Sequence, residues 1–185
     1  MILPIYIYGQ PVLRQVAEDI DESYPDLGQL IENMWETLAA SEGIGLAAPQ
    51  VGKSIRLVVI DLDLVSDDMP EYKGLKRVFI NPHIEELDDT ETDISEEGCL
   101  SLPGIHERVR RPTRIRVRYQ DEQFQQHDEW VEGYLARVMQ HEFDHLEGHV
   151  FTDHVKGLRR QLVRGKLADL TKGNFSCSYK VKWKK

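Results

Sequence analysis

Apolar residues recur along the chain at two spacings, and each spacing predicts a different kind of element. Spacings of three and four predict helices, because residues three or four apart share one helical face. This pattern covers residues 27–40, 130–147 and 158–170. Gly148 follows the second stretch and is the residue type that often ends a helix in the left-handed conformation. We therefore expect three helices, of which the second, from Trp130 to Glu147, runs through the core.

Other stretches are rich in Val, Ile and Leu or alternate apolar with polar residues, which predicts strands. These stretches are Ile55–Leu62, Arg77–Asn81, Arg114–Tyr119 and Ser176–Trp183. A polar loop is expected between Asp63 and Lys76, and solvated loops and faces along the acidic run from Glu85 to Glu97. The order of elements predicts an α+β fold in a single domain spanning residues 1–185, with mixed or antiparallel strands packed around the central helix.

Composition agrees with a soluble globular chain. Of 185 residues, 41% are hydrophobic and 30% are charged, which is ordinary for one domain. No apolar run approaches a membrane span, so no membrane partner is expected, and the N-terminus lacks the features of a secretory signal. The two cysteines, Cys99 and Cys177, are therefore expected to be reduced thiols in the cytoplasm.

Charge is unevenly distributed along the chain. The net charge is −9, yet residues 156–185 carry ten basic residues and one acid, Asp169, so that residues 1–155 carry −18. A basic helix and tail from about residue 156 are a candidate for contact with an anionic partner, nucleic acid included. The alternative is that this segment only offsets the acidic body.

The strongest chemical signal is His141-Glu142-Phe143-Asp144-His145. On a helix, His141 and His145 lie one turn apart on one face, where both imidazoles can bind one divalent metal ion. Glu142 lies beside the first ligand and is close enough to take a proton from a metal-bound water. The alternative is an exposed polar helix face.

A metal site of this kind needs a third ligand. Cys99 lies upstream within Glu96-Glu97-Gly98-Cys99-Leu100-Ser101, and a Cys/His/His set leaves one tetrahedral position for water. The alternative for Cys99 is a buried inert thiol. The other candidates lie downstream and are Glu147, His149, Asp153 and His154. Glu147 and His149 are too close to the two histidines along the same helix to turn toward the metal easily.

Three segments together resemble the signature motifs of the peptide deformylase family. They are Gly43-Ile44-Gly45-Leu46-Ala47-Ala48-Pro49-Gln50, Glu97-Gly98-Cys99-Leu100-Ser101 and the His141–His145 stretch, and they occur in the family's order. The resemblance begins at Gly9-Gln10-Pro11-Val12-Leu13-Arg14 and covers nearly the whole chain. It ends at the extension from Asn174, which differs from the helical tail of the best-known bacterial members.

The resemblance implies that the protein removes the N-formyl group from the initiator formyl-methionine of nascent polypeptides and releases formate. Cys99, His141 and His145 would hold the metal, which is usually ferrous iron in the family, with zinc, nickel or cobalt often found in purified material. Glu142 would move the proton from water to the leaving amine. Gln50 and the backbone N–H of Leu100 would donate to the oxyanion, and Gly45 would meet the formyl or peptide group.

Further residues beside these motifs are expected to serve the substrate. Glu97 and Arg111 would pair and brace the Cys99 loop, with an ordinary surface salt bridge as the alternative. Ile44 and Val138 suit an unbranched methionine side chain. The complete expected substrate-binding set is Ile44, Glu97, Gly98, Arg111, Tyr134, Arg137 and Val138. The alternative for Ile44, Tyr134, Arg137 and Val138 is plain core packing.

Some members of the family dock on ribosomes through a basic C-terminal helix, which makes a ribosome contact possible here. The candidate basic residues are Arg159, Arg160, Arg164, Lys166, Lys180, Lys182, Lys184 and Lys185, with Leu158, Leu162, Leu167 and Leu170 expected to face the body. Alternatively, Lys180 and Lys182 form the wet face of an edge strand. Two rival functions are a zinc endopeptidase and a non-catalytic metal- or ribosome-binding protein. The presence of Cys99, Gln50 and Glu142 argues against both.

Overall fold

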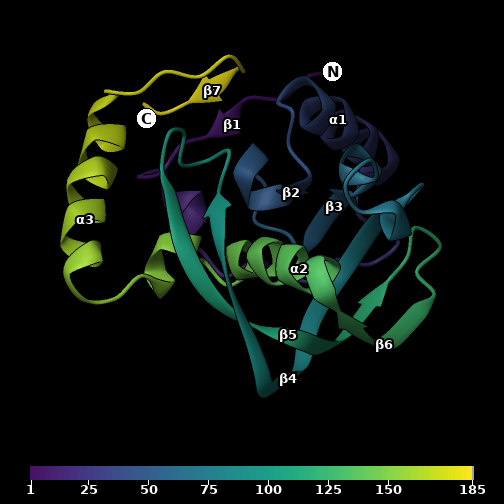
Figure 1. The fold of residues 1–185 in the computed structure, drawn as a ribbon. Helices are drawn as coiled ribbons and strands as arrows, with labels where there is room; N and C mark the ends of the chain where they lie inside the picture. The colour runs from purple at the N-terminus through teal and green to yellow at the C-terminus, as the bar shows by residue number, and fades with distance from the viewer. Residues whose placement is uncertain (185) are drawn as a thin grey trace.

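The computed structural model describes residues 1–184, and within them an antiparallel sheet curves around one central helix (Figure 1). Lys185 of the expected basic tail lies outside the described residues. The strands are β1 Ile5–Tyr6, β2 Gly45–Ala47, β3 Leu57–Asp61, β4 Lys76–Gly98, β5 His106–Gln120, β6 Gln126–Glu132 and β7 Val181–Lys182. The α-helices are α1 Leu27–Ala40, α2 Gly133–Leu146 and α3 Gly157–Lys172. Short 3-10 helices are η1 Pro11–Arg14, η2 Ala48–Val51, η3 Asp63–Val65, η4 Pro70–Tyr72 and η5 Phe151–His154.

The strands form two sheets. The larger has the order β2-β3-β4-β5-β6 with every neighbouring pair antiparallel, and the smaller joins β1 and β7 in parallel. The predicted α+β class is therefore confirmed. No helix within residues 1–184 has the length and apolar character that a bilayer crossing requires.

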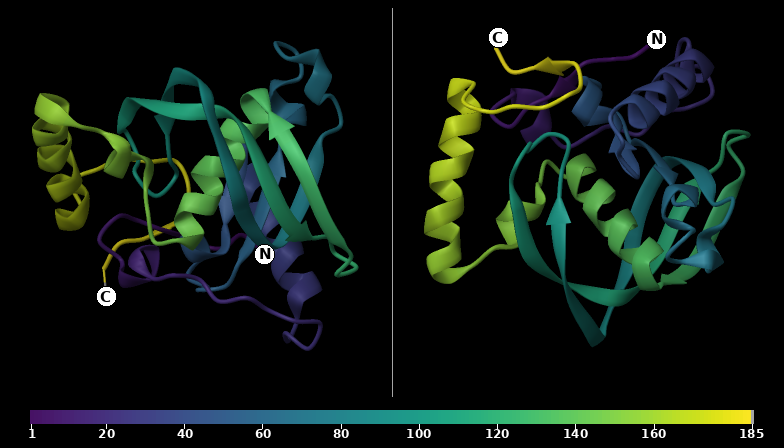
Figure 2. Two further views of the ribbon diagram at one scale, coloured as in Figure 1. Left: turned by 90° about the horizontal axis from the view of Figure 1, so that it is seen from below. Right: turned by 45° about the horizontal axis from the view of Figure 1, so that its top comes forward.

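The central helix α2 lies in the hollow of the larger sheet, and the views of Figure 2 agree on this placement. Its buried residues include Leu135, Met139 and Phe143, which pack with sheet residues in one hydrophobic cluster. Gly148, predicted to end the helix, has a φ of 74°. A side chain there would also meet the backbone of Arg14 at 2.8 Å. Both features require glycine at this position.

The predicted start of α2 at Trp130 was wrong by three residues. Residues 130–132 belong to β6, where Trp130 is exposed and Val131 is buried, as the alternation of a strand requires. The change from strand to helix occurs at Gly133, which has a φ of 71°. Apolar spacing could not separate these two periods, because both place Val131 on the buried side.

The acidic run from Glu85 to Glu97 was expected to form solvated loops and faces. The prediction of loops was wrong. It lies within β4, which continues to Gly98 and pairs along most of its length with β5. Basic residues of β5 lie opposite acidic residues of β4. For example, the guanidinium of Arg116 lies 2.7 Å from the carboxylate of Glu86. Opposite charges across the two strands stabilise the pairing. The sequence of β4 by itself showed a polar segment and did not show the strand that pairs with it.

The predicted third helix is present as α3. Of the four leucines predicted to face the body, Leu167 and Leu170 do so, and the prediction was wrong for the other two. Leu158 and Leu162 are 74% and 55% exposed, whereas Val163 and Leu170 are buried. The buried face therefore follows Val163, Leu167 and Leu170, whose spacing of four and three is also helical. Near the C-terminus, only Val181–Lys182 of the predicted strand Ser176–Trp183 pairs, with β1.

Candidate metal centre

Three predicted ligands converge between β4 and α2. His141 and His145 project from one face of α2, and Cys99 directly follows the end of β4. One donor atom from each residue lies within 4.8 Å of the other two, and Cys99 Sγ lies 3.3 Å from His145 Nε2. Two ligand atoms of a tetrahedral site with bonds of about 2.0–2.3 Å are about 3.3–3.6 Å apart. The donor set and its spacing fit one metal ion.

The electrostatics of these ligands also favour a cation. Burial opposes ionisation of the Cys99 thiol, but the neighbouring His145 and His141 outweigh it and lower the pKa of Cys99 to about 5. Burial likewise opposes the charged form of His141, but the hydrogen bonds with Cys99 and Glu97 raise the pKa of His141 well above its ordinary value. A thiolate is the form that binds metals. The cluster therefore attracts positive charge, which a divalent metal would supply.

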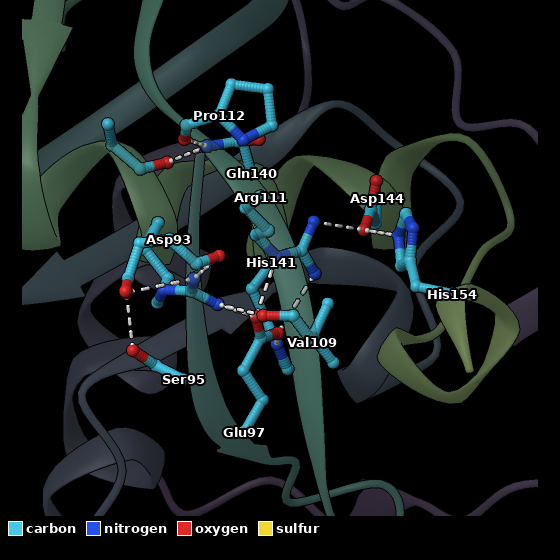
Figure 3. A network of polar contacts seen from close by, with 12 residues as sticks. Asp93, Ser95, Glu97, Val109, Arg111, Pro112, Gln140, His141, Asp144 and His154 are labelled. Atoms are coloured by element: carbon cyan, nitrogen blue, oxygen red, sulfur yellow. Dashed lines mark hydrogen bonds and ion pairs between the residues drawn. The ribbon is translucent and has the colours of Figure 1, made fainter. Parts of the chain in front are cut away.

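A buried ion network holds His141 from behind (Figure 3). Glu97 Oε1 lies 2.8 Å from His141 Nδ1, which leaves Nε2 free to face Cys99. Arg111 makes two hydrogen bonds to Glu97, of 2.7 and 2.9 Å, and Arg137 donates a third of 2.6 Å. Such contacts to the distal nitrogen orient a metal-binding histidine.

The charge of Glu97 is secured by its partners. Burial alone would raise the pKa of Glu97, but the hydrogen bonds with His141 and Arg111 lower it to about 2. The side chains of Arg111 and Glu97 are only 4% and 6% exposed, so the alternative of a surface salt bridge was wrong. Figure 3 shows the network continuing from Arg111 to Asp144 and on to His154, over 3.0 and 2.8 Å.

Glu142 lies on the buried side of α2, directly against Gly45 of β2. A Cβ at Gly45 would lie 2.5 Å from Glu142 Oε1, so only glycine leaves room for this carboxylate. The other oxygen, Oε2, is buried and has no hydrogen-bond partner among residues 1–184. Burial is the main cause that raises the pKa of Glu142. An unpartnered carboxylate with a raised pKa suits proton transfer.

Gln50 and Leu100 present hydrogen-bond donors beside Cys99. The Oε1 atom of Gln50 accepts from the backbone N–H of Ala47 at 2.9 Å, which turns the amide NH₂ toward Cys99 Sγ, 3.4 Å away. The same NH₂ lies 3.3 Å from Ser101 Oγ. The backbone N–H of Leu100 makes no hydrogen bond within the part of the chain described. Two donors therefore lie next to the ligand cluster.

These groups open onto a cavity of about 470 Å³. Most predicted site residues line it, namely Ile44, Gly45, Gln50, Glu97, Gly98, Cys99, Leu100, Tyr134, Arg137, Val138, His141 and Glu142. Arg111 and His145 do not line it and lie behind the wall. The guanidinium of Arg137 is bound to Glu97, to the Val109 carbonyl and to Asp93, so these contacts occupy its head group.

The sequence analysis did not identify some residues of the cavity wall. Glu42 precedes the first motif and lines the cavity, as do Ser176, Cys177, Ser178 and Tyr179 of the C-terminal tail. Asp144 lies inside the His141–His145 motif, and its spacing of three from His141 is a signal for a neighbouring role. The tail residues had no such signal, because they are distant in sequence from every motif.

Comparisons with known proteins agree across the chain. A family model described as Polypeptide deformylase matches residues 2–161. The peptide deformylase of Christiangramia forsetii is 46% identical over 99% of this chain and 96% of its own length, and that of Salinibacter ruber is 45% identical over 97% and 93%. The crystal structure of a peptide deformylase from Thermotoga maritima has a TM-score of 0.75 and 41% identity over 85% of this chain and 99% of its own. One from Synechococcus elongatus, in complex with actinonin, has a TM-score of 0.78 and 38% identity over 94% and 89%.

Proposed function

This chain belongs to the polypeptide deformylase family, whose enzymes remove the N-formyl group from nascent peptides, and from that premise we propose which residues carry the reaction here. The chain is a hydrolase of a metal-dependent family. Cys99, His141 and His145 hold one divalent metal ion. The observation that supports this assignment most directly is the convergence of their donor atoms within 4.8 Å beside the buried carboxylate of Glu142.

Ferrous iron is our choice for the native metal. When bound by these three residues, the metal would act as a Lewis acid, lowering the pKa of water and polarising the formyl carbonyl. A thiolate with two imidazoles suits several transition metals, so zinc, nickel or cobalt can take the same place in purified protein. The preference for iron rests on the resemblance to the family, and the donor set is compatible with it.

Glu142 moves the protons of the reaction. Its carboxylate accepts a proton from the attacking water and delivers it to the amine of methionine as the amide bond breaks and formate leaves. Burial raises the pKa of Glu142, which makes its carboxylate a better proton acceptor than an exposed one. Because Gly45 has no side chain, the Glu142 carboxylate has room to face the cavity.

The developing negative charge on the formyl oxygen is stabilised by the chain itself. The Gln50 amide and the Leu100 N–H are two donors beside Cys99, and the bond from the Ala47 N–H already fixes the Gln50 amide. Pre-organised donors of this kind contribute a large share of catalysis in acyl transfer. Ile44, Tyr134 and Val138 line the cavity and provide an apolar place for the methionine side chain.

The substrate is the formyl-methionyl end of a nascent polypeptide, and the reaction takes place in the cytoplasm, where such chains emerge. We also propose contact with the ribosome through α3, which carries Arg160, Arg164 and Lys166 on exposed positions. Arg159 contributes less, because its guanidinium pairs with Glu107 at 2.7 Å. The exposure of Leu158 adds apolar surface to the same helix.

The experiment that tests the activity compares blocked peptides. The anaerobically purified, metal-loaded protein is incubated with formyl-Met and acetyl-Met peptides of the same sequence, and formate and new amino termini are measured. We expect release from the formyl peptide only. Cleavage at internal peptide bonds would identify an endopeptidase, and no release from either peptide would indicate a non-catalytic metal protein.

A further inference from the structure

The tail that follows α3 returns to the cavity. After Lys172 the chain passes over the molecule to reach β7 beside β1, as Figures 1 and 2 both show. On the way, residues 176–179 form part of the cavity wall. This segment lies beyond residue 161, where the match to the family model ends. A part of the chain that the family model does not match therefore meets the reaction site.

The tail is held firmly in this position. The backbone N–H groups of Ile5 and Ile7 donate to the carbonyls of Lys180 and Lys182, at 2.8 and 2.9 Å. Trp183 packs so closely on Gly173 that a Cβ there would lie 2.5 Å from its ring. These contacts fix the residues on either side of Tyr179.

Tyr179 connects the tail to the segment that carries a metal ligand. Its hydroxyl donates to the carbonyl of Leu100 at 2.7 Å, and its half-buried ring packs against the hydrophobic core. The neighbouring carbonyls also have donors, the Leu102 N–H for Cys99 and the Tyr8 N–H for Ser101, both at 2.9 Å. Each of these three successive carbonyls thus accepts a hydrogen bond, and among the described residues the tail supplies one of the three donors, the Tyr179 hydroxyl.

We propose that Tyr179 is a positioning residue for deformylation, holding the Leu100 carbonyl so that the N–H of the same residue points at the formyl oxygen. This inference rests on the proposed role of the Leu100 N–H as an oxyanion donor. The N–H of Leu100 shares a peptide plane with the Cys99 carbonyl, which the Leu102 N–H holds. The Tyr179 hydroxyl holds the next peptide plane through the Leu100 carbonyl, so the two bonds together limit rotation of the backbone at Leu100. Catalysis by such donors depends on their orientation before the charge develops.

The test replaces only the hydroxyl, with Tyr179→Phe, and uses Tyr24→Phe as the matched control. Tyr24 is also partly buried against the same hydrophobic cluster, and its hydroxyl has no hydrogen bond within residues 1–184. Both variants are loaded with the same metal, and their metal content and melting temperature are measured. The kinetic constants kcat and KM are then determined on a short formyl-Met dipeptide and on a formyl-Met hexapeptide.

We expect Tyr179→Phe to lower kcat about 2- to 10-fold, the effect of losing one neutral hydrogen bond, with KM nearly unchanged. The loss should be equal for both peptides, and metal content should remain that of the parent. Tyr24→Phe should match the parent in both constants. A split between kcat and KM is the sign of an interaction that matters in the transition state.

Several results would overturn the inference. An unchanged kcat in Tyr179→Phe would remove the hydroxyl from the reaction. A rise in KM that grows with peptide length would make Tyr179 a direct substrate contact, and a loss that follows lower metal content or melting temperature would make it a structural support only. If the parent and Tyr24→Phe also released no formate, the proposed function itself would fail. An active parent with an equally active Tyr179→Phe refutes this inference alone.

Discussion

Glu142 is the residue whose environment differs most from its ordinary chemistry. Its carboxylate is buried against Gly45, and one oxygen has no partner within the described chain. Burying a polar group without a partner costs free energy, so retaining it here is explained by a role in the reaction. The residue therefore offers the sharpest test of the proton-transfer step.

Glu142→Gln should retain the metal and lose about 10²- to 10⁴-fold in kcat, because the ligands remain while the proton carrier is removed. Turnover of a formyl-Met peptide and the metal content of the same sample are the measurements. Glu132→Gln, an exposed change just before α2, is the control and should remain active. Full activity in metal-loaded Glu142→Gln would exclude Glu142 from the mechanism.

Gly45→Ala should displace the same carboxylate without altering any charge. The new Cβ would meet Glu142 Oε1 at 2.5 Å, so the side chain must move away from its place. A misplacement of this size is expected to lower kcat about 10- to 100-fold. The control is Gly165→Ala in α3, where nothing lies within 4 Å of the added atom. Equal activity in both variants would show that the exact place of Glu142 is unimportant.

At the scale of single residues, the sequence indicated the candidate ligands and the supporting pair of Glu97 and Arg111, but not the other contacts around them. His141, His145 and Cys99 could be predicted, because metal binding requires particular residue types at particular spacings. The contact of Tyr179 with Leu100 could not be predicted, since a tyrosine and a backbone carbonyl 79 residues apart leave no pattern. Packing of Gly45 on Glu142 likewise depends on how β2 and α2 meet in space.

Among the elements, β4, β5 and α2 are joined by the ion network behind the metal centre. Arg111 of β5 bridges Glu97 of β4 and Asp144 of α2, at 2.7 and 3.0 Å, while being only 4% exposed. Removing one member of a buried ion pair leaves the other charge without compensation. The network should therefore contribute to the stability of the fold as well as to the orientation of His141.

Arg111→Met should lower the free energy of unfolding by about 3 kcal/mol, near the lower end for breaking a buried pair, because Glu97 keeps Arg137. Urea unfolding at fixed metal content is the measurement. Arg116→Met is the control, since this arginine of β5 pairs with Glu86 and Asp128 at the surface. It should cost about 0–1 kcal/mol. Equal losses would show that burial of the Arg111 network adds nothing.

A second link joins η1 to η5. Arg14 donates to Asp153 at 2.6 Å, and Asp153 also accepts from the Val150 N–H. Burial would raise the pKa of Asp153, but the Arg14 and Val150 hydrogen bonds outweigh it and lower the pKa. The folded state therefore prefers the charged carboxylate. This contribution is complete above the unfolded value of about 3.9 and is lost as the pH falls through the lower folded value.

Asp153→Asn should lower the free energy of unfolding relative to the parent. The difference between the two proteins should be constant above about pH 5 and should shrink below about pH 4. Urea unfolding at a series of pH values, with metal-free protein throughout, measures this difference. Asp67→Asn removes an exposed carboxylate that has no ion pair within the described residues, and it reports the effect of net charge alone. A difference that stays constant down to about pH 2 would contradict the link.

Some helices and strands were easier to predict from the sequence than others. Helices α1 and α2 have one dominant apolar face, so their spacing identified them, whereas α3 has two competing sets of leucines and valines. The pattern could not show which set meets the body, because that depends on the direction in which η5 delivers the chain. The long pairing of β4 with β5 depends on charges in the partner strand, which one strand does not reveal.

At the scale of the whole molecule, charge is divided between an acidic body and a basic end. Residues 1–155 carry −18 and residues 156–185 carry +9. Figure 1 shows α3 at one side of the molecule, apart from α2. A basic helix placed there can meet a polyanion while the cavity stays open to a peptide. Such binding has an affinity that falls with salt, because it releases counterions.

Replacing Arg160, Arg164 and Lys166 with Gln should weaken co-sedimentation with ribosomes at low salt and leave turnover of a short formyl-Met peptide unchanged. The salt slope of binding should fall by about one for each phosphate that the variant no longer binds. The control, with the same loss of charge at exposed positions elsewhere, replaces Lys53, Lys73 and Arg110. It should bind like the parent if α3 is the docking element. Equal weakening by both triple variants would mean that net charge alone governs binding, and no co-sedimentation of the parent would exclude docking through α3.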